Sequence, residues 1–83
     1  MSLRFRGHMS NEDLDQLRVA YKRAVDRWVD AIRAEEALAT RDYSETAWER
    51  WDAAHFHEED AHNQAIAARN AYEDGLRRVN FGF

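Results

Sequence analysis

The chain contains no cysteine, no proline and only three glycines among its 83 residues. Without cysteine it can form no disulfide, no thiolate zinc site and no thiol nucleophile. Without proline, almost nothing interrupts a helix between Ser10 and Val79, because the only glycine in that range is Gly75. These absences favour a single small helical domain that is held together by side-chain packing.

Long apolar runs and a strong excess of one charge are also missing. No stretch approaches the roughly 18 apolar residues that span a bilayer, and no basic start followed by an apolar stretch resembles a signal peptide. The 12 basic and 16 acidic residues give a net charge of −4, which provides no electrostatic basis for binding nucleic acid. We therefore expect a cytoplasmic protein that binds neither membranes nor nucleic acid.

The residues that are abundant indicate an all-α protein. Apolar residues make up 45% of the chain, which is too high for a disordered segment. Alanine, arginine, glutamate and leucine all have high helix propensities. Arginine outnumbers lysine by eleven to one, a bias associated with GC-rich bacterial genomes, so we expect a bacterial source.

The first predicted helix runs from about residue 11 to residue 39. Ser10 is a candidate N-cap, and Asp13 occupies the capping-box position three residues later. Apolar residues then recur at helical spacing and form a stripe about 120° wide, as expected of a helix that packs on one side. This stripe comprises Leu14, Leu17, Tyr21, Val25, Trp28, Val29, Ile32 and Ala39.

The second predicted helix runs from about residue 44 to residue 79, with Ser44 as its N-cap. Its inner positions alternate in steps of four and three, a pattern typical of antiparallel coiled-coil packing. These positions are Ala47, Trp51, Ala54, Glu58, Ala61, Ala65, Ala68, Tyr72, Leu76 and Val79.

The short connection near Asp42 makes the two helices antiparallel neighbours. The sequence therefore predicts an antiparallel two-helix hairpin, a single domain over residues 10–83, with the tail from Asn80 to Phe83 beyond the second helix. Residues 1–9 carry no capping or periodic signal and are expected to form a flexible arm. Met9 is a candidate natural start, in which case residues 1–8 derive from an expression vector.

Both helices carry more apolar surface than one hairpin can bury. Val25 and Val29 widen the stripe of the first helix, Trp48 and Ile66 form a second apolar flank on the other helix, and Phe56 points away from the contact. A monomer would then expose more contiguous apolar area than the few hundred Å² that soluble monomers usually show. We expect a twofold homodimer that forms a four-helix bundle through these five residues, with a larger protein partner as the alternative.

Acidic and histidine residues cluster in the second helix. Glu59 and His62 are three residues apart and share a helix face, while His55 precedes Glu59 by one turn and Glu35 is an acid on the first helix. This Glu-x-x-His spacing resembles the ferritin-like class of four-helix metal proteins, including short versions built from two-helix protomers. The resemblance implies a carboxylate-bridged metal site.

The predicted register places these candidate ligands apart within one hairpin. With the turn centred near Asp42, Glu35 lies opposite about Arg50, three turns from Glu59, so only a dimer would bring the groups together. We therefore prefer the interpretation in which the protein has no metal and no cofactor. His57 and Asp60 are then surface residues, and His55, Glu59 and His62 are polar groups at the edge of the apolar stripe. Glu58 lies among alanines, where we expect it to set the register with an arginine partner or to reach solvent.

Catalytic patterns are missing from the chain. It has no glycine-rich phosphate loop and no nucleophile elbow. The preferred hypothesis is a non-enzymatic helical hairpin that self-associates and acts by binding a protein partner. The alternative is a metal-binding ferritin-like protein that uses Glu59, His62 and acids of the first helix. A third hypothesis, an acidic mimic of nucleic acid, is disfavoured because the net charge is small and the acids alternate with arginines.

Overall fold

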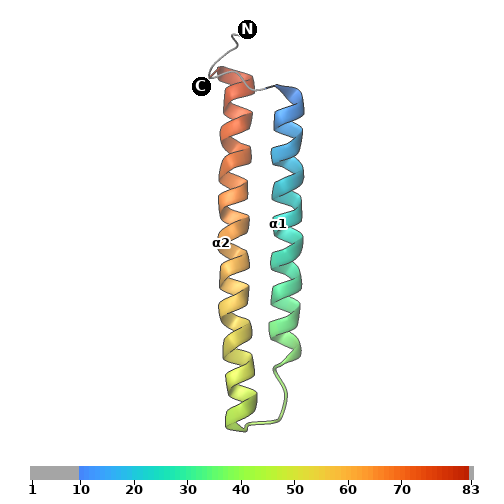
Figure 1. Ribbon diagram of the computed structural model, residues 1–83, viewed down its shortest axis with the longest axis vertical. Helices are drawn as coiled ribbons and strands as arrows, with labels where there is room; N and C mark the ends of the chain where they lie inside the picture. The colour runs from blue at the N-terminus through green and yellow to red at the C-terminus, as the bar shows by residue number, and fades with distance from the viewer. Residues whose placement is uncertain (1–9, 83) are drawn as a thin grey trace.

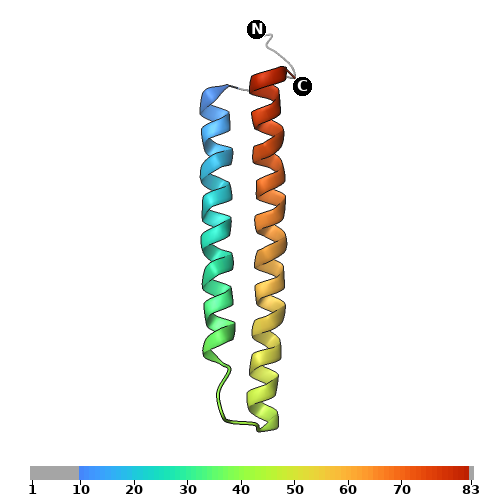
Figure 2. The ribbon, with the colours of Figure 1, turned by 180° about the vertical axis from the view of Figure 1, so that it is seen from behind.

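The computed structural model describes residues 10–82 as two long helices that lie side by side and run antiparallel (Figures 1 and 2). Helix α1 comprises Asn11–Ala37 and helix α2 comprises Glu45–Phe81, and the described residues contain no strand. The predicted helical hairpin is confirmed. Residues 1–9, which we predicted to be a flexible arm, and Phe83 lie outside the described residues.

Both helices begin at the serines that the sequence indicates. The Ser10 hydroxyl accepts a hydrogen bond from the Asp13 N–H at 3.0 Å, and the Ser44 hydroxyl accepts one from the Ala47 N–H at 3.1 Å. Each bond satisfies one of the free N–H groups of the first turn.

The far end of α2 lies two residues beyond the predicted limit of Val79. Gly82 adopts a left-handed conformation with a φ of 77°, and its N–H donates to the carbonyl of Arg78 at 2.9 Å. Glycine adopts this conformation without a steric penalty, and it commonly terminates helices. Phe81 therefore belongs to the last turn of α2 and not to the tail in which we had placed it.

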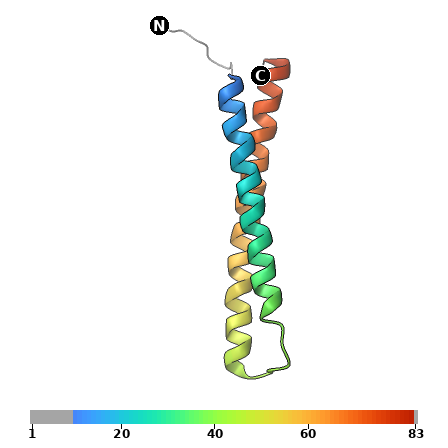
Figure 3. The same cartoon turned by 90° about the vertical axis from the view of Figure 1, so that its right-hand side faces the viewer.

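The connection of residues 38–44 is held by short side-chain to backbone hydrogen bonds. The Thr40 hydroxyl accepts from the Asp42 N–H at 3.2 Å, and the Asp42 carboxylate accepts from the Ser44 N–H at 3.0 Å. This second bond lowers the pKa of Asp42 below its ordinary value of 3.8, because it favours the charged carboxylate. The connection runs down beside the start of α2, so the first turns of α2 lie beyond the end of α1 (Figure 3).

The contact between α1 and α2 is built from small side chains. The buried apolar residues of residues 10–82 are all alanines, between 2% and 6% exposed: Ala24, Ala31, Ala61 and Ala65. Gly75 of α2 is buried as well. Larger residues lie at the margins of this contact, where Tyr21 stacks on Tyr72 with ring centroids 6.0 Å apart. The result is a thin rod with dimensions of 62 × 21 × 14 Å.

Candidate functional site

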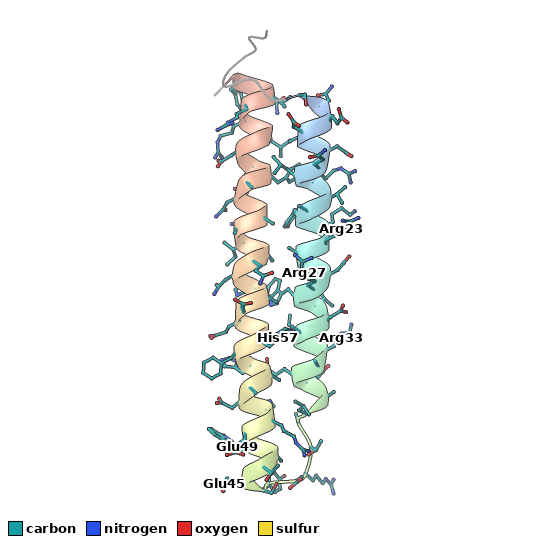
Figure 4. The ribbon with its side chains drawn as sticks, in the orientation of Figure 1. Arg23, Arg27, Arg33, Glu45, Glu49 and His57 are labelled. Atoms are coloured by element: carbon teal, nitrogen blue, oxygen red, sulfur yellow. The ribbon has the colours of Figure 1, made fainter. Side chains whose placement is uncertain are left out.

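Grooves run along both sides of the hairpin between the helices. We call one groove the polar groove after the charged and amide side chains that border its alanine floor, and its labelled members Arg27 and His57 lie over the gap between the helices in Figure 4. Within it the Gln64 amide donates to the Asp60 carboxylate at 2.9 Å. Its charged groups are solvated and of both signs. The groove is lined by Arg27, Asp30, Ala31, Ala34, His57, Asp60, Ala61 and Gln64.

The other side of the hairpin carries the large apolar side chains. One groove there is lined in part by Val25, Trp28 and Ile66, and a second one, nearer the connection, includes Ile32 and Trp51. Val29 lies on the same flank of α1, because it is one turn from Val25 and three residues from Ile32. Trp48 joins Trp51 in a pocket against the connection. We call the following residues the apolar face: Val25, Trp28, Val29, Ile32, Trp48, Trp51 and Ile66.

Most of the apolar face is in contact with solvent. Trp48 is 60% exposed, and Val29, Ile32 and Ile66 are each close to 40% exposed. Trp51 is 38% exposed and does not form part of the interhelical core, contrary to its predicted inner position. Trp51 lies in the first turns of α2, near the end of α1, where it borders one groove with Ile32 and Glu35 of α1 and another with residues of the connection.

Phe56 is the one predicted interface residue that the structure separates from the others. It is 63% exposed and lies about 80° around α2 from Ile66 at 100° per residue. It therefore projects away from the apolar face.

A cluster of two carboxylates and one imidazole lies between the helices beside Ile32 and Trp51. Glu35 of α1 joins His55 and Glu58 of α2, and one ligand atom of each lies within 4.8 Å of the others. The Glu35 carboxylate is 3.4 Å from Nδ1 of His55. All three side chains are half-buried. The cluster is therefore partly shielded from water while remaining accessible from the apolar face.

This contact corrects the predicted register. Glu35 lies against His55 and not against Arg50, five residues earlier in α2. The prediction assumed a tight turn, whereas residues 38–44 descend beside α2 before the chain reverses (Figure 3). Because of this displacement, Glu35 meets the histidine cluster within a single hairpin.

The remaining candidate ligands take different positions. The Glu59 carboxylate lies 3.6 Å from Nε2 of His55, on the opposite edge of the ring from Glu35. His62 stacks on Trp28, with ring centroids 4.3 Å apart and planes 14° apart, and it contributes no atom to the cluster. The Glu59–His62 pair is thus not brought together with Glu35.

Glu58 is the member of the cluster that the sequence analysis did not count as a ligand. Its carboxylate accepts a hydrogen bond from the indole N–H of Trp28 at 2.7 Å, so its partner is a tryptophan and not the expected arginine. A signal for its role was available, because His55 and Glu58 have the same three-residue spacing as Glu59 and His62. In this pair the histidine comes before the glutamate, the reverse of the Glu-x-x-His order, so the pair does not match that motif.

Comparison with protein-family models, curated proteins and solved structures finds no match to this chain. Within residues 10–82, neither helix is long and apolar enough to cross a membrane. A functional assignment therefore depends on the two features described above, the apolar face and the Glu35–His55–Glu58 cluster.

Proposed function

We propose that the protein is a non-enzymatic helical hairpin that functions as a self-associated assembly, most simply a twofold dimer in the form of a four-helix bundle. The observation that supports this best is the division of apolar residues within the hairpin. The interhelical core consists of alanine methyl groups, whereas the large apolar side chains lie on the apolar face. Their burial requires a second surface.

The small size of the buried side chains limits the stability of a single hairpin. Burial of a methylene-sized group contributes about 0.8 kcal/mol, and full burial of a side chain such as isoleucine about 1.5–3 kcal/mol. The four buried alanines contribute at the lower end of this scale. Ordering each residue costs about 1–2 kcal/mol of backbone entropy. Dimerisation would bury Val29, Ile32 and Ile66, which are only partly covered now.

The charges around the apolar face favour a second copy of the same chain as the occupant. Arg69 borders the groove that contains Ile66, whereas Glu35 and Glu36 border the groove that contains Ile32. We call these the basic end and the acidic end of the face, where the basic end is the single Arg69, whose Nε lies 3.9 Å from the carboxylate of Glu73. An antiparallel twofold arrangement would place the acidic end of one copy against the basic end of the other, which is the self-complementarity that such an interface requires.

Sedimentation velocity and light scattering between about 1 and 100 µM test the proposal. We expect a mass of about twice the 9.8 kDa of one chain. Ile66→Glu and Trp48→Glu should weaken the dimer by about 100-fold or more, since each buries an unpaired carboxylate. Arg33→Glu is the control, because Arg33 lies on the outer side of α1 in Figure 4 and should not affect association.

Two results would contradict self-association. One is a mass near 9.8 kDa that does not change up to about 100 µM, which would leave the apolar face to a different protein. The other is a dimer that withstands Ile66→Glu and Trp48→Glu but dissociates in Arg33→Glu, which would place the interface elsewhere. Circular dichroism of each variant confirms that its helices are retained.

A further inference from the structure

The cluster at the acidic end of the apolar face has an arrangement that ion pairing within the chain does not explain. It combines Glu35 and Glu58 with His55, and Glu59 approaches the same ring from the other side. A protonated imidazole carries one positive charge and can neutralise only one of these carboxylates. Among residues 10–82, no lysine or arginine forms an ion pair with any of them.

We propose that Glu35, His55 and Glu58 bind one divalent first-row transition-metal ion per chain. An ion would supply the positive charge that the carboxylates lack. The three ligand atoms are already within 4.8 Å of one another. Side-chain adjustments alone would therefore place each of them at roughly 2.0–2.2 Å from a shared ion, the ligand-to-metal distance that such ions require. All three ligands come from one chain, although the dimer proposed above would bring Arg69 of the second copy toward Glu35.

The donor set indicates the class of ion. One imidazole nitrogen and two carboxylate oxygens suit Zn²⁺, Co²⁺ or Fe²⁺. Calcium and magnesium prefer sites made entirely of oxygen, and copper(I) prefers the thiolates that this chain lacks. Three protein ligands leave at least one coordination position for water.

Neighbouring side chains hold two of the ligands in suitable orientations. The indole of Trp28 donates to Oε2 of Glu58, which leaves Oε1 of that carboxylate for the ion. Nδ1 of His55 faces Glu35, while its Nε2 faces Glu59 at 3.6 Å. We assign Nδ1 as the ligand atom. Nε2 and the Glu59 carboxylate are 3.6 Å apart, just beyond hydrogen-bond distance, so a small side-chain shift on metal binding would make Glu59 the acceptor for the opposite N–H. This is the partner that a metal-bound histidine usually has.

The polar groove does not offer an equivalent site. His57 and Asp60 line it, but they lie on the far side of the contact from Glu35 and are not part of the cluster. His57 is only two residues from His55 and is exposed. It is therefore a matched control for the removal of a histidine from the same segment of α2.

Titration of the metal-free full-length chain with Co²⁺, followed by visible absorption, tests the site, and calorimetry with Zn²⁺ gives the stoichiometry. We expect one ion per chain. His55→Ala and Glu35→Gln should each weaken binding by more than 100-fold, and His57→Ala by less than about threefold. Glu59→Gln alters only the carboxylate next to Nε2 of His55, which is not a ligand, and should weaken binding by about 10- to 100-fold.

A second measurement avoids variants altogether. In the wild-type chain, bound Co²⁺ should shift and broaden the His55 ring resonances in NMR spectra far more than those of His57. The proposal is overturned if no stoichiometric binding occurs at 100 µM metal, or if binding survives both His55→Ala and Glu35→Gln. Binding that is lost in His62→Ala but retained in Glu35→Gln would also overturn it, since the ion would then lie at the Glu59–His62 pair.

Discussion

Replacement of Trp28 by phenylalanine should destabilise the hairpin chiefly because Glu58 loses its hydrogen-bond donor. The two side chains are 2.7 Å apart from donor to acceptor, a length typical of bonds to a charged group. Such bonds contribute about 1.5–3 kcal/mol when well buried. Both residues here are only half-buried, so solvent screens the interaction and we expect a coupling energy of about 1 kcal/mol.

A double-mutant cycle isolates this contribution. Trp28→Phe, Glu58→Ala and the double variant are compared by urea unfolding, at one protein concentration and with a chelator present, because alanine removes the acceptor whereas glutamine would keep one. Trp28→Phe also changes the stacking on His62, but that loss occurs in both arms of the cycle and cancels. The double variant should be about 1 kcal/mol more stable than the sum of the single effects predicts.

The size of the coupling energy shows whether Trp28 stabilises the Glu58 carboxylate. A value of about 1 kcal/mol corresponds to roughly 4–8 °C in the midpoint of thermal unfolding for a domain of this length. Sites that do not interact are additive to within about 0.3–0.5 kcal/mol. A coupling below that range would refute the assignment of Trp28 as the partner that stabilises the Glu58 carboxylate.

Two further predictions concern the core and the connection. Ala65→Leu should lower the free energy of unfolding by about 1–3 kcal/mol, because Ala65 is 4% exposed and the helices must separate to admit a larger side chain. Thermal unfolding measures this loss. An unchanged midpoint would contradict the close approach of α1 and α2. The Asp42 carboxyl should titrate below 3.8 in NMR spectra, because the Ser44 N–H lowers its pKa. Because the pKa is lower in the folded state, the ionised Asp42 stabilises the fold above pH 3.8, and this contribution is lost as the pH falls through the folded-state pKa. The stability difference between wild type and Asp42→Asn should therefore disappear on acidification.

The sequence predicts those parts of the fold that depend on local chemistry. Ser10 and Ser44 mark the two helix starts because a hydroxyl at an N-cap contacts its own first turn. Gly82 is an equally local signal, because a glycine that adopts a left-handed conformation commonly ends a helix, and here it places Phe81 in the last turn of α2. Helical periodicity places Ala61 and Ala65 of α2 in the interhelical contact, but the predicted stripe of the first helix omits Ala24 and Ala31, which are the buried residues of α1.

The composition of the cluster depends on the register and was not predicted from the sequence. The register is set by the path of residues 38–44, which descend beside α2, and hydrogen bonds of Thr40 and Asp42 hold that path. A displacement of five residues along α2 replaces Arg50 by His55 as the neighbour of Glu35.

The alanine core has a consequence for how the chain finds its native pairing. Ala24 and Ala31 are separated by seven residues, two helical turns, so sliding α1 along α2 by that distance would again bring a methyl group to a similar place. Alanine packing alone therefore separates the native alignment from a slipped one by only a small energy gap. Larger side chains near the middle of the rod, above all Trp28, supply the remainder. A substitution there would raise the population of misaligned hairpins whose helix content is nearly native.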